Sequence, residues 1–225
     1  MTDILFNARA FAAKDWATVL FVLSFALIAL TKNVFESRFS DFSKLAFSNK
    51  YIKIYRESEM MSWFNIMLFL VQLLSFAFFI QLLLSYSDSH VVSYYSKTDY
   101  ILFIRIFTLL GVFILAKYLV EKIISTSFNI EDFAEQFNLQ KVSYRTYSGI
   151  VLLPINIILF YNDSISIIFF YVVIAAILIT NLLTYLNSLK IYQNLIFSKL
   201  FYFILYLCAL EIGPYYFMYY WFTRS

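Results

Sequence analysis

The stretch "WFNIMLFLVQLLSFAFFIQLLL", residues 63–84, decides the fold class of this chain. It holds no Asp, Glu, Lys or Arg, and its length matches the roughly 20 apolar residues with which a helix crosses a bilayer. A helix satisfies every backbone N–H and C=O within its own segment, as lipid requires. The stretch therefore predicts a transmembrane helix.

The composition of the whole chain extends this interpretation. Of 225 residues, 62% are hydrophobic and 14% are charged, and the mean hydropathy is +0.76. A soluble domain is about 45–50% apolar and about 25% charged, so a soluble fold of this size would leave much apolar surface in water. The sequence predicts a polytopic membrane protein.

Five more apolar segments predict an all-α bundle of transmembrane helices, in one domain over residues 1–225. The six predicted spans cover about residues 16–34, 63–85, 100–123, 144–161, 165–187 and 199–222. No small-residue cleavage site follows the first apolar run, so we expect it to remain as a span rather than to be removed as a signal peptide.

Two segments between spans are expected to form amphipathic helices at the membrane interface. In residues 35–48, Phe residues recur at helical spacing among charged residues. In residues 129–141, Phe133 and Phe137 lie on one helical face. The second segment is either a surface helix that joins two spans or a docking helix for a cytoplasmic partner.

The distribution of Lys and Arg predicts the orientation, because cytoplasmic loops carry an excess of these residues. With the N-terminus outside the cytoplasm, the inner regions hold 12 Lys and Arg and the outer regions hold four. The inner set is Lys32, Arg38, Lys44, Lys50, Lys53, Arg56, Lys117, Lys122, Lys141, Arg145, Lys190 and Lys199, and the outer set is Arg9, Lys14, Lys97 and Arg224. Six spans then place both termini outside.

Helix-breaking residues lie within the predicted spans. Pro154 and the pair Gly213–Pro214 are expected to kink the fourth and sixth spans. Each kink has a polar side chain nearby, Asn156 in the fourth span and Glu211 in the sixth. Either transmembrane helices simply tolerate these residues, or the kinked helices form part of a site between helices, as broken helices do in transporters.

Two charged residues lie well inside predicted spans. Arg105 and Glu211 would each cost on the order of 2.5–3.5 kcal/mol or more at the centre of a bilayer. One hypothesis is an ion pair that joins the third and sixth spans. The alternatives are a proton or ion relay through Glu211, or an Arg105 side chain that reaches the outer interface while Glu211 is protonated or hydrogen-bonded.

The uncharged polar residues within spans are expected to form hydrogen bonds between helices. This set comprises Asn65, Gln72, Gln81, Asn156, Asn181 and Asn187. Lys117 and Glu121, four residues apart, are expected to form an ion pair at the inner interface.

No catalytic, metal or cofactor site is expected. The chain has one Cys, Cys208, and one His, His90, and it lacks the HExxH, phosphate-loop and G-x-S-x-G motifs. The basic and aromatic stretch "NKYIKIYR", residues 49–56, indicates contact with anionic lipid at the cytoplasmic face rather than with nucleic acid.

Three stretches resemble a known family. "FYFILYLCALEIGP", residues 201–214, is similar to the C-terminal signature of an uncharacterised family of integral-membrane proteins of Bacteroidota. "LPINIIL", residues 153–159, and the arrangement from Trp16 to Lys32 also resemble that family. The resemblance implies a multi-pass protein of a bacterial inner membrane, with periplasmic termini in the orientation above, and implies no activity.

We therefore expect a non-enzymatic scaffold or accessory subunit of a larger bacterial envelope complex, with secretion or gliding machinery as a candidate. Its partners would be the bilayer, anionic lipid and other proteins of that complex. The alternative is a small proton- or ion-coupled transporter that uses Glu211 and the helices kinked at Pro154 and Pro214.

Overall fold

The computed structural model describes residues 14–45, 51, 54–55, 62–86, 97–127, 131–162 and 166–191. These residues form helices and no strand, which confirms the predicted all-helical fold class. The helices are α1 (Asp15–Val34), α2 (Glu36–Ser43), α4 (Trp63–Tyr86), α5 (Tyr100–Ser127), α6 (Glu131–Tyr161) and α7 (Ile167–Ile191).

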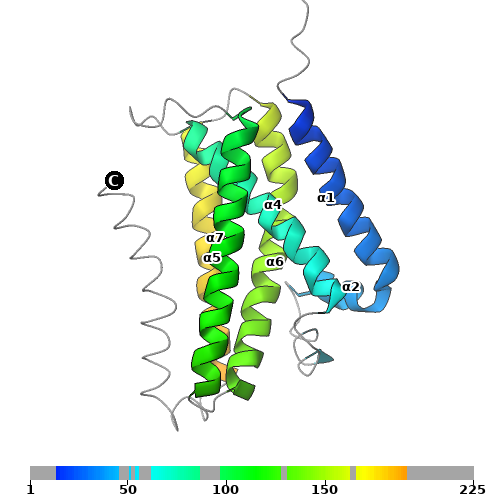
Figure 1. The fold of residues 1–225 in the computed structure, drawn as a ribbon, viewed down its shortest axis with the longest axis vertical. Coiled ribbons are helices and arrows are strands. Elements are labelled where there is room, and N and C mark those ends of the chain that lie inside the picture. Colours follow the sequence, from blue (N-terminus) through cyan, green and yellow to red (C-terminus); the bar gives the residue numbers. More distant parts are fainter. Residues whose placement is uncertain are drawn as a thin grey trace, which may run out of the picture.

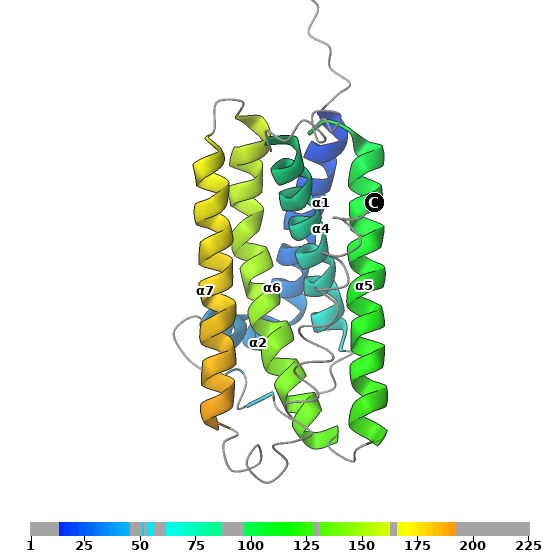
Figure 2. The same ribbon diagram turned by 90° about the vertical axis from the view of Figure 1, so that its left-hand side faces the viewer.

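The five long helices run up and down between two ends of a bundle (Figure 1). At the end that we call the Tyr100 end, α1, α5 and α7 begin and α4 and α6 finish. The opposite end, where α5 finishes and α6 begins, is the Glu131 end. Helix α4 is central, because it packs against α1, α5 and α6, and its contact with α6 is the most extensive. Helix α7 packs beside α6 on the outer side of the bundle (Figure 2).

Four helical segments have the length and composition of membrane spans. They are Asp15–Val34, Trp63–Tyr86, Tyr100–Ser127 and Asn138–Tyr161, and α7 contributes a shorter apolar stretch, Ile167–Leu182. These segments correspond to the first five predicted spans, and the predicted sixth span, residues 199–222, lies outside the described residues. The protein is therefore membrane-embedded through several apolar helices.

Helix α6 differs from its prediction in one respect. The sequence suggested an interfacial helix over residues 129–141 and a separate span over 144–161, whereas the structure has one helix of 31 residues. The physical reason is that neither Gly nor Pro occurs between Glu131 and Ser148, so that nothing interrupts the backbone hydrogen bonds there. The other predicted interfacial segment, 35–48, contains the short helix α2.

Helices α5 and α6 are longer than the membrane requires. At about 1.5 Å per residue, α1 with 20 residues is ~30 Å long, whereas α5 with 28 residues is ~42 Å long and α6 with 31 residues is ~46 Å long. The hydrocarbon core of a bilayer is ~30 Å thick. At the Glu131 end, α5 and α6 extend together beyond α1 and α2 (Figure 1).

The core toward the Tyr100 end is built from aromatic rings. We call this group, Trp16, Phe21, Phe78, Phe103 and Phe160, the Trp16 cluster. Phe78 lies at its centre, with ring centroids 4.4 Å from both Phe21 and Phe103. The indole N–H of Trp16 donates to the Thr98 carbonyl at 3.1 Å, which satisfies its one polar atom. The rings thus join α1, α4, α5 and α6.

Candidate functional site

Helices α6 and α4 approach each other closely where they cross at Gly149 and Gln72. A Cβ atom added to Gly149 would lie 2.9 Å from the Cα atom of Gln72, which is closer than real side chains approach a backbone. Only a residue without a side chain allows the two backbones to meet in this way. Gly149 therefore fixes the position of α6 on α4.

Polar side chains lie on both sides of this crossing, and we call the group Gln72, Ser75, Thr146 and Asn156 the polar seam. Thr146 Oγ1 donates to Gln72 Oε1 at 2.9 Å. Asn156 Nδ2 donates to the Ser75 carbonyl oxygen at 2.7 Å and lies 3.2 Å from its hydroxyl oxygen. All four side chains are buried, and each hydrogen bond joins α4 to α6.

Hydrogen bonding in the polar seam is incomplete. Gln72 Nε2 and Asn156 Oδ1 are buried and have no hydrogen-bond partner within the described part of the chain. An amide group has both donors and acceptors, so each of these two side chains uses only part of its capacity.

Two other predicted intramembrane polar residues, Gln81 and Asn181, have different kinds of hydrogen-bond partner. Gln81, near the Tyr100 end of α4, donates from Nε2 to the Asp99 carbonyl at 2.8 Å, and so fixes the start of α5. Asn181 instead donates to the Ile177 carbonyl of its own helix at 2.9 Å. Pro154 lies inside α6, which continues through it to Tyr161.

The structure describes only one partner, Arg105, of the predicted ion pair of Arg105 and Glu211. Arg105 is on α5 with an exposed side chain, whereas Glu211, Gly213 and Pro214 lie outside the described residues. The pair therefore stays a prediction.

The acidic residue Glu121 joins the long helices near the Glu131 end. Its Oε1 atom lies 3.2 Å from Lys141 Nζ on α6 and 4.0 Å from Lys117 Nζ on α5. The sequence indicated the pair within α5 from its spacing of four residues, but it gave no sign of the contact with Lys141. Since only 4% of Glu121 is exposed, this ion pair is a contact between helices rather than a solvated surface pair.

A second aromatic cluster lies on the side of the bundle toward the Glu131 end, next to α2. It contains Phe42, Leu45, Tyr51, Phe64 and Leu68, and it holds the segment after α2 against α4 and α6. The guanidinium of Arg38 lies 4.8 Å from the ring centroid of Phe64 and 4.9 Å from that of Tyr55, and its Nη1 donates to the Ser62 hydroxyl at 3.0 Å. We call the group Phe42, Leu45, Tyr51, Phe64 and Leu68 the Phe42 cluster.

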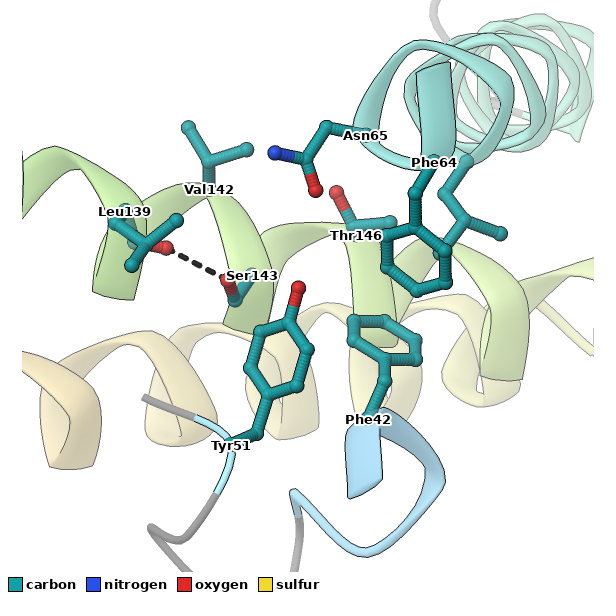
Figure 3. Close-up of a pocket in the computed structure, with 9 residues that line it drawn as sticks. Phe42, Tyr51, Phe64, Asn65, Leu139, Val142, Ser143 and Thr146 are labelled. Carbon is teal, nitrogen blue, oxygen red and sulfur yellow. Dashed lines mark hydrogen bonds between the residues drawn. The ribbon is translucent and has the colours of Figure 1, made fainter. Parts of the chain in front are cut away.

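A small cavity of about 20 Å³ lies behind the Phe42 cluster (Figure 3). Its polar lining comes from Tyr51, Asn65, Ser143 and Thr146, and its remaining lining is apolar. The sequence reasoning did not single out Tyr51, Ser143 or Thr146. A usable signal was the series Gln140, Ser143, Thr146 and Gly149, in which a polar or small residue recurs every three residues, so that each lies next to the following one on the surface of α6.

Replacing Asn156 by Leu should weaken the contact of α4 with α6, because the hydrogen bonds to Ser75 are lost. Hydrogen bonds between transmembrane helices contribute about 0.6 kcal/mol and up to ~1.7 kcal/mol, and we expect a loss in that range. The measurement is unfolding of the purified protein in mixed micelles with increasing SDS. Asn181→Leu is the matched control, because its hydrogen bond stays within α7; equal losses for both variants would contradict the prediction.

Within the described ranges, no group of three or more His, Cys, Asp or Glu side chains is arranged to hold a metal ion.

Comparison with proteins of known function gives no match among curated proteins. No solved structure matches either. One family does match, over residues 17–222, and it is described as a domain of unknown function (DUF4271). Because the match covers nearly all of the sequence, the chain belongs to the DUF4271 family.

Proposed function

We propose that this protein is a non-catalytic scaffold or accessory subunit of a larger envelope complex in the inner membrane of a bacterium, a member of the Bacteroidota. The Glu131 end faces the cytoplasm in this proposal and both termini are periplasmic, because the excess of Lys and Arg belongs to the regions at that end. The hairpin of α5 and α6 is the element that receives a partner.

The observation that carries this proposal is the excess length of α5 and α6. Both helices continue past α1 and α2 at the Glu131 end (Figure 1), with α7 beside α6 (Figure 2). The contact of Glu121 with Lys141 joins α5 to α6. A span that continues as a rigid helix outside the lipid presents side chains at a fixed distance from the membrane. Such a projecting hairpin suits docking of another protein better than it suits transport or catalysis.

The packing toward the Tyr100 end also supports a structural role. Phe78, Phe103 and Phe160 are each at least 96% buried in the middle of the bundle. A solute that crossed between α1, α4, α5 and α6 would have to separate these packed rings. At the opposite end, the exposed side chains of Lys32 and Lys44 suit contact with anionic lipid, which would hold the subunit at its cytoplasmic surface.

Purification of the full-length protein from its native membrane in mild detergent tests the proposal. We expect other envelope proteins to co-elute in fixed ratio, and we expect the double variant Lys122→Glu, Ile123→Asn on the exposed side of the hairpin to reduce their recovery. Lys32→Glu is the matched control, because it changes the same charge at the same end but on α1. A stable monomer without partners that shows pH-dependent solute flux in liposomes would overturn the proposal.

The second candidate function is a small proton- or ion-coupled transporter. It is favoured by the incomplete hydrogen bonding of Gln72 and Asn156 in the polar seam, close to Pro154 in α6. In this alternative, Glu211 carries the proton or ion and the helices with Pro154 and Pro214 move. Flux into liposomes that is lost in Glu211→Gln would establish it in place of the scaffold.

A further inference from the structure

We propose that the cavity behind the Phe42 cluster is a binding site for one internal water molecule, which links the segment around Tyr51 to the polar seam. This inference is independent of the scaffold function. A buried water needs a cavity of at least about 10–15 Å³ and two to four polar partners. The cavity has a volume of about 20 Å³, so it is large enough for one water molecule and too small for an organic solute.

The hydroxyl groups of α6 provide acceptors for this water. Ser143 Oγ donates its one hydrogen to the Leu139 carbonyl at 2.7 Å, and Thr146 Oγ1 donates its hydrogen to Gln72 Oε1 at 2.9 Å. A hydroxyl has one hydrogen and two lone pairs. Both oxygen atoms therefore keep lone pairs beside the cavity, and a water molecule can donate one hydrogen to each of them.

Tyr51 lies beside the cavity and is hydrogen-bonded to Ser143 and to Arg38. Its side chain is 99% buried, and its hydroxyl group points toward Ser143 and the space in front of Thr146 (Figure 3). Burial raises the pKa of Tyr51, and this effect outweighs the opposite influence of Arg38 and Ser143. The phenol thus keeps its hydrogen at neutral pH. Because Ser143 gives its own hydrogen to the Leu139 carbonyl, the phenol donates to Ser143 Oγ, whose second lone pair is left for the water.

The chemistry of the lining favours water over an ion. The residues that line the cavity, namely Phe42, Tyr51, Phe64, Asn65, Leu68, Leu139, Val142, Ser143 and Thr146, include no acidic side chain. A bound cation would take more oxygen ligands than the hydroxyl and amide groups here supply. A dry cavity is expected only where the lining is apolar, and this lining contains three hydroxyl groups and an amide.

Such a water would connect two parts of the fold. Thr146 belongs to the polar seam through its hydrogen bond to Gln72, whereas Tyr51 belongs to the Phe42 cluster. A water molecule that donates to Ser143 and to Thr146 would extend the hydrogen bond between Tyr51 and Ser143 to the polar seam, and would couple packing of the Phe42 cluster to the crossing of α4 and α6.

Hydroxyl-radical footprinting of the full-length protein in lipid nanodiscs tests this site, with a rapid change into water labelled with ¹⁸O. Radiolysis of a trapped water modifies the side chains around it. We expect Tyr51, Phe64 and Leu68 to be modified although each residue is 99% buried. We also expect them to take up ¹⁸O more slowly than the exposed ring of Tyr100.

Phe78 is the internal reference, because it is as deeply buried as Phe64 and lies in the Trp16 cluster. Modification of Tyr51, Phe64 and Leu68 no greater than that of Phe78 would overturn the proposal, and the wild-type protein alone decides this. Ser143→Val, which removes an acceptor and adds methyl groups at the cavity, should lower the modification several-fold. Unchanged modification in a folded Ser143→Val protein would mean that the label enters by local opening, and it would also overturn the proposal.

Discussion

Gly149→Ala is expected to lower the free energy of unfolding by about 1–3 kcal/mol, which is typical of an overpacked site. The added Cβ atom would meet Gln72 at its Cα, Cγ and Cβ atoms, at 2.9, 3.0 and 3.1 Å. The nearest of these is a backbone atom, which cannot turn aside as the end of a flexible side chain can. Helix α6 must therefore move away from α4, which also stretches the hydrogen bond of Thr146 to Gln72.

Gly111→Ala in α5 is the matched control for this prediction. There the added Cβ atom would lie 3.7 Å from the nearest atom of the Leu73 side chain, an ordinary van der Waals distance. Since Ala favours a helix over Gly by up to ~1 kcal/mol, this variant should be neutral or more stable. The free energy of unfolding of both variants is measured by SDS-induced unfolding in mixed micelles. Equal stability of the two variants would show that the crossing at Gly149 is looser than described.

The sequence was sufficient for the apolar spans that the structure describes, but not for the contacts between them. The uncharged run over residues 63–84 predicts a span because length and hydropathy are local properties, and α4 follows it closely. The continuity of α6 could also have been predicted, since the absence of Gly and Pro between Glu131 and Gly149 favours one helix. The amphipathic pattern of residues 129–141 instead drew attention to a separate surface helix.

The pairing of polar residues depends on the relative shift and rotation of two helices, which the sequence of either helix leaves open. Gln72 and Asn156 were both expected to bond between helices, but nothing in the sequence assigns Thr146 to the first and Ser75 to the second. In the same way, the spacing of Lys117 and Glu121 is visible, whereas the contact with Lys141 follows from the packing of α5 on α6. Hydrogen-bonding partners of this kind emerge only from the assembled bundle.

Phe78→Ala is expected to cost about 2 kcal/mol or more of stability. In soluble cores, the replacement of Phe by Ala costs about 3–5 kcal/mol, part of which is the transfer of the side chain out of water. That part is smaller in a membrane, because a separated helix keeps its apolar residues in lipid, and the lost van der Waals packing remains. The ring of Phe78 contacts α1 through Trp16 and Phe21 and α5 through Phe103, so its loss affects two helix pairs at once.

Phe169→Ala on α7 removes the same ring from a different environment and is the control for Phe78→Ala. Phe169 is 43% exposed on the outside of the bundle, whereas Phe78 is 1% exposed. If the Trp16 cluster holds α1, α4 and α5 together, the interior variant should unfold at clearly lower SDS and lose the near-ultraviolet circular dichroism of the packed Trp16, while the surface variant keeps both. Should Phe78→Ala behave like Phe169→Ala, the packed rings would contribute little to holding these helices together, and they would not be a barrier to a solute between them.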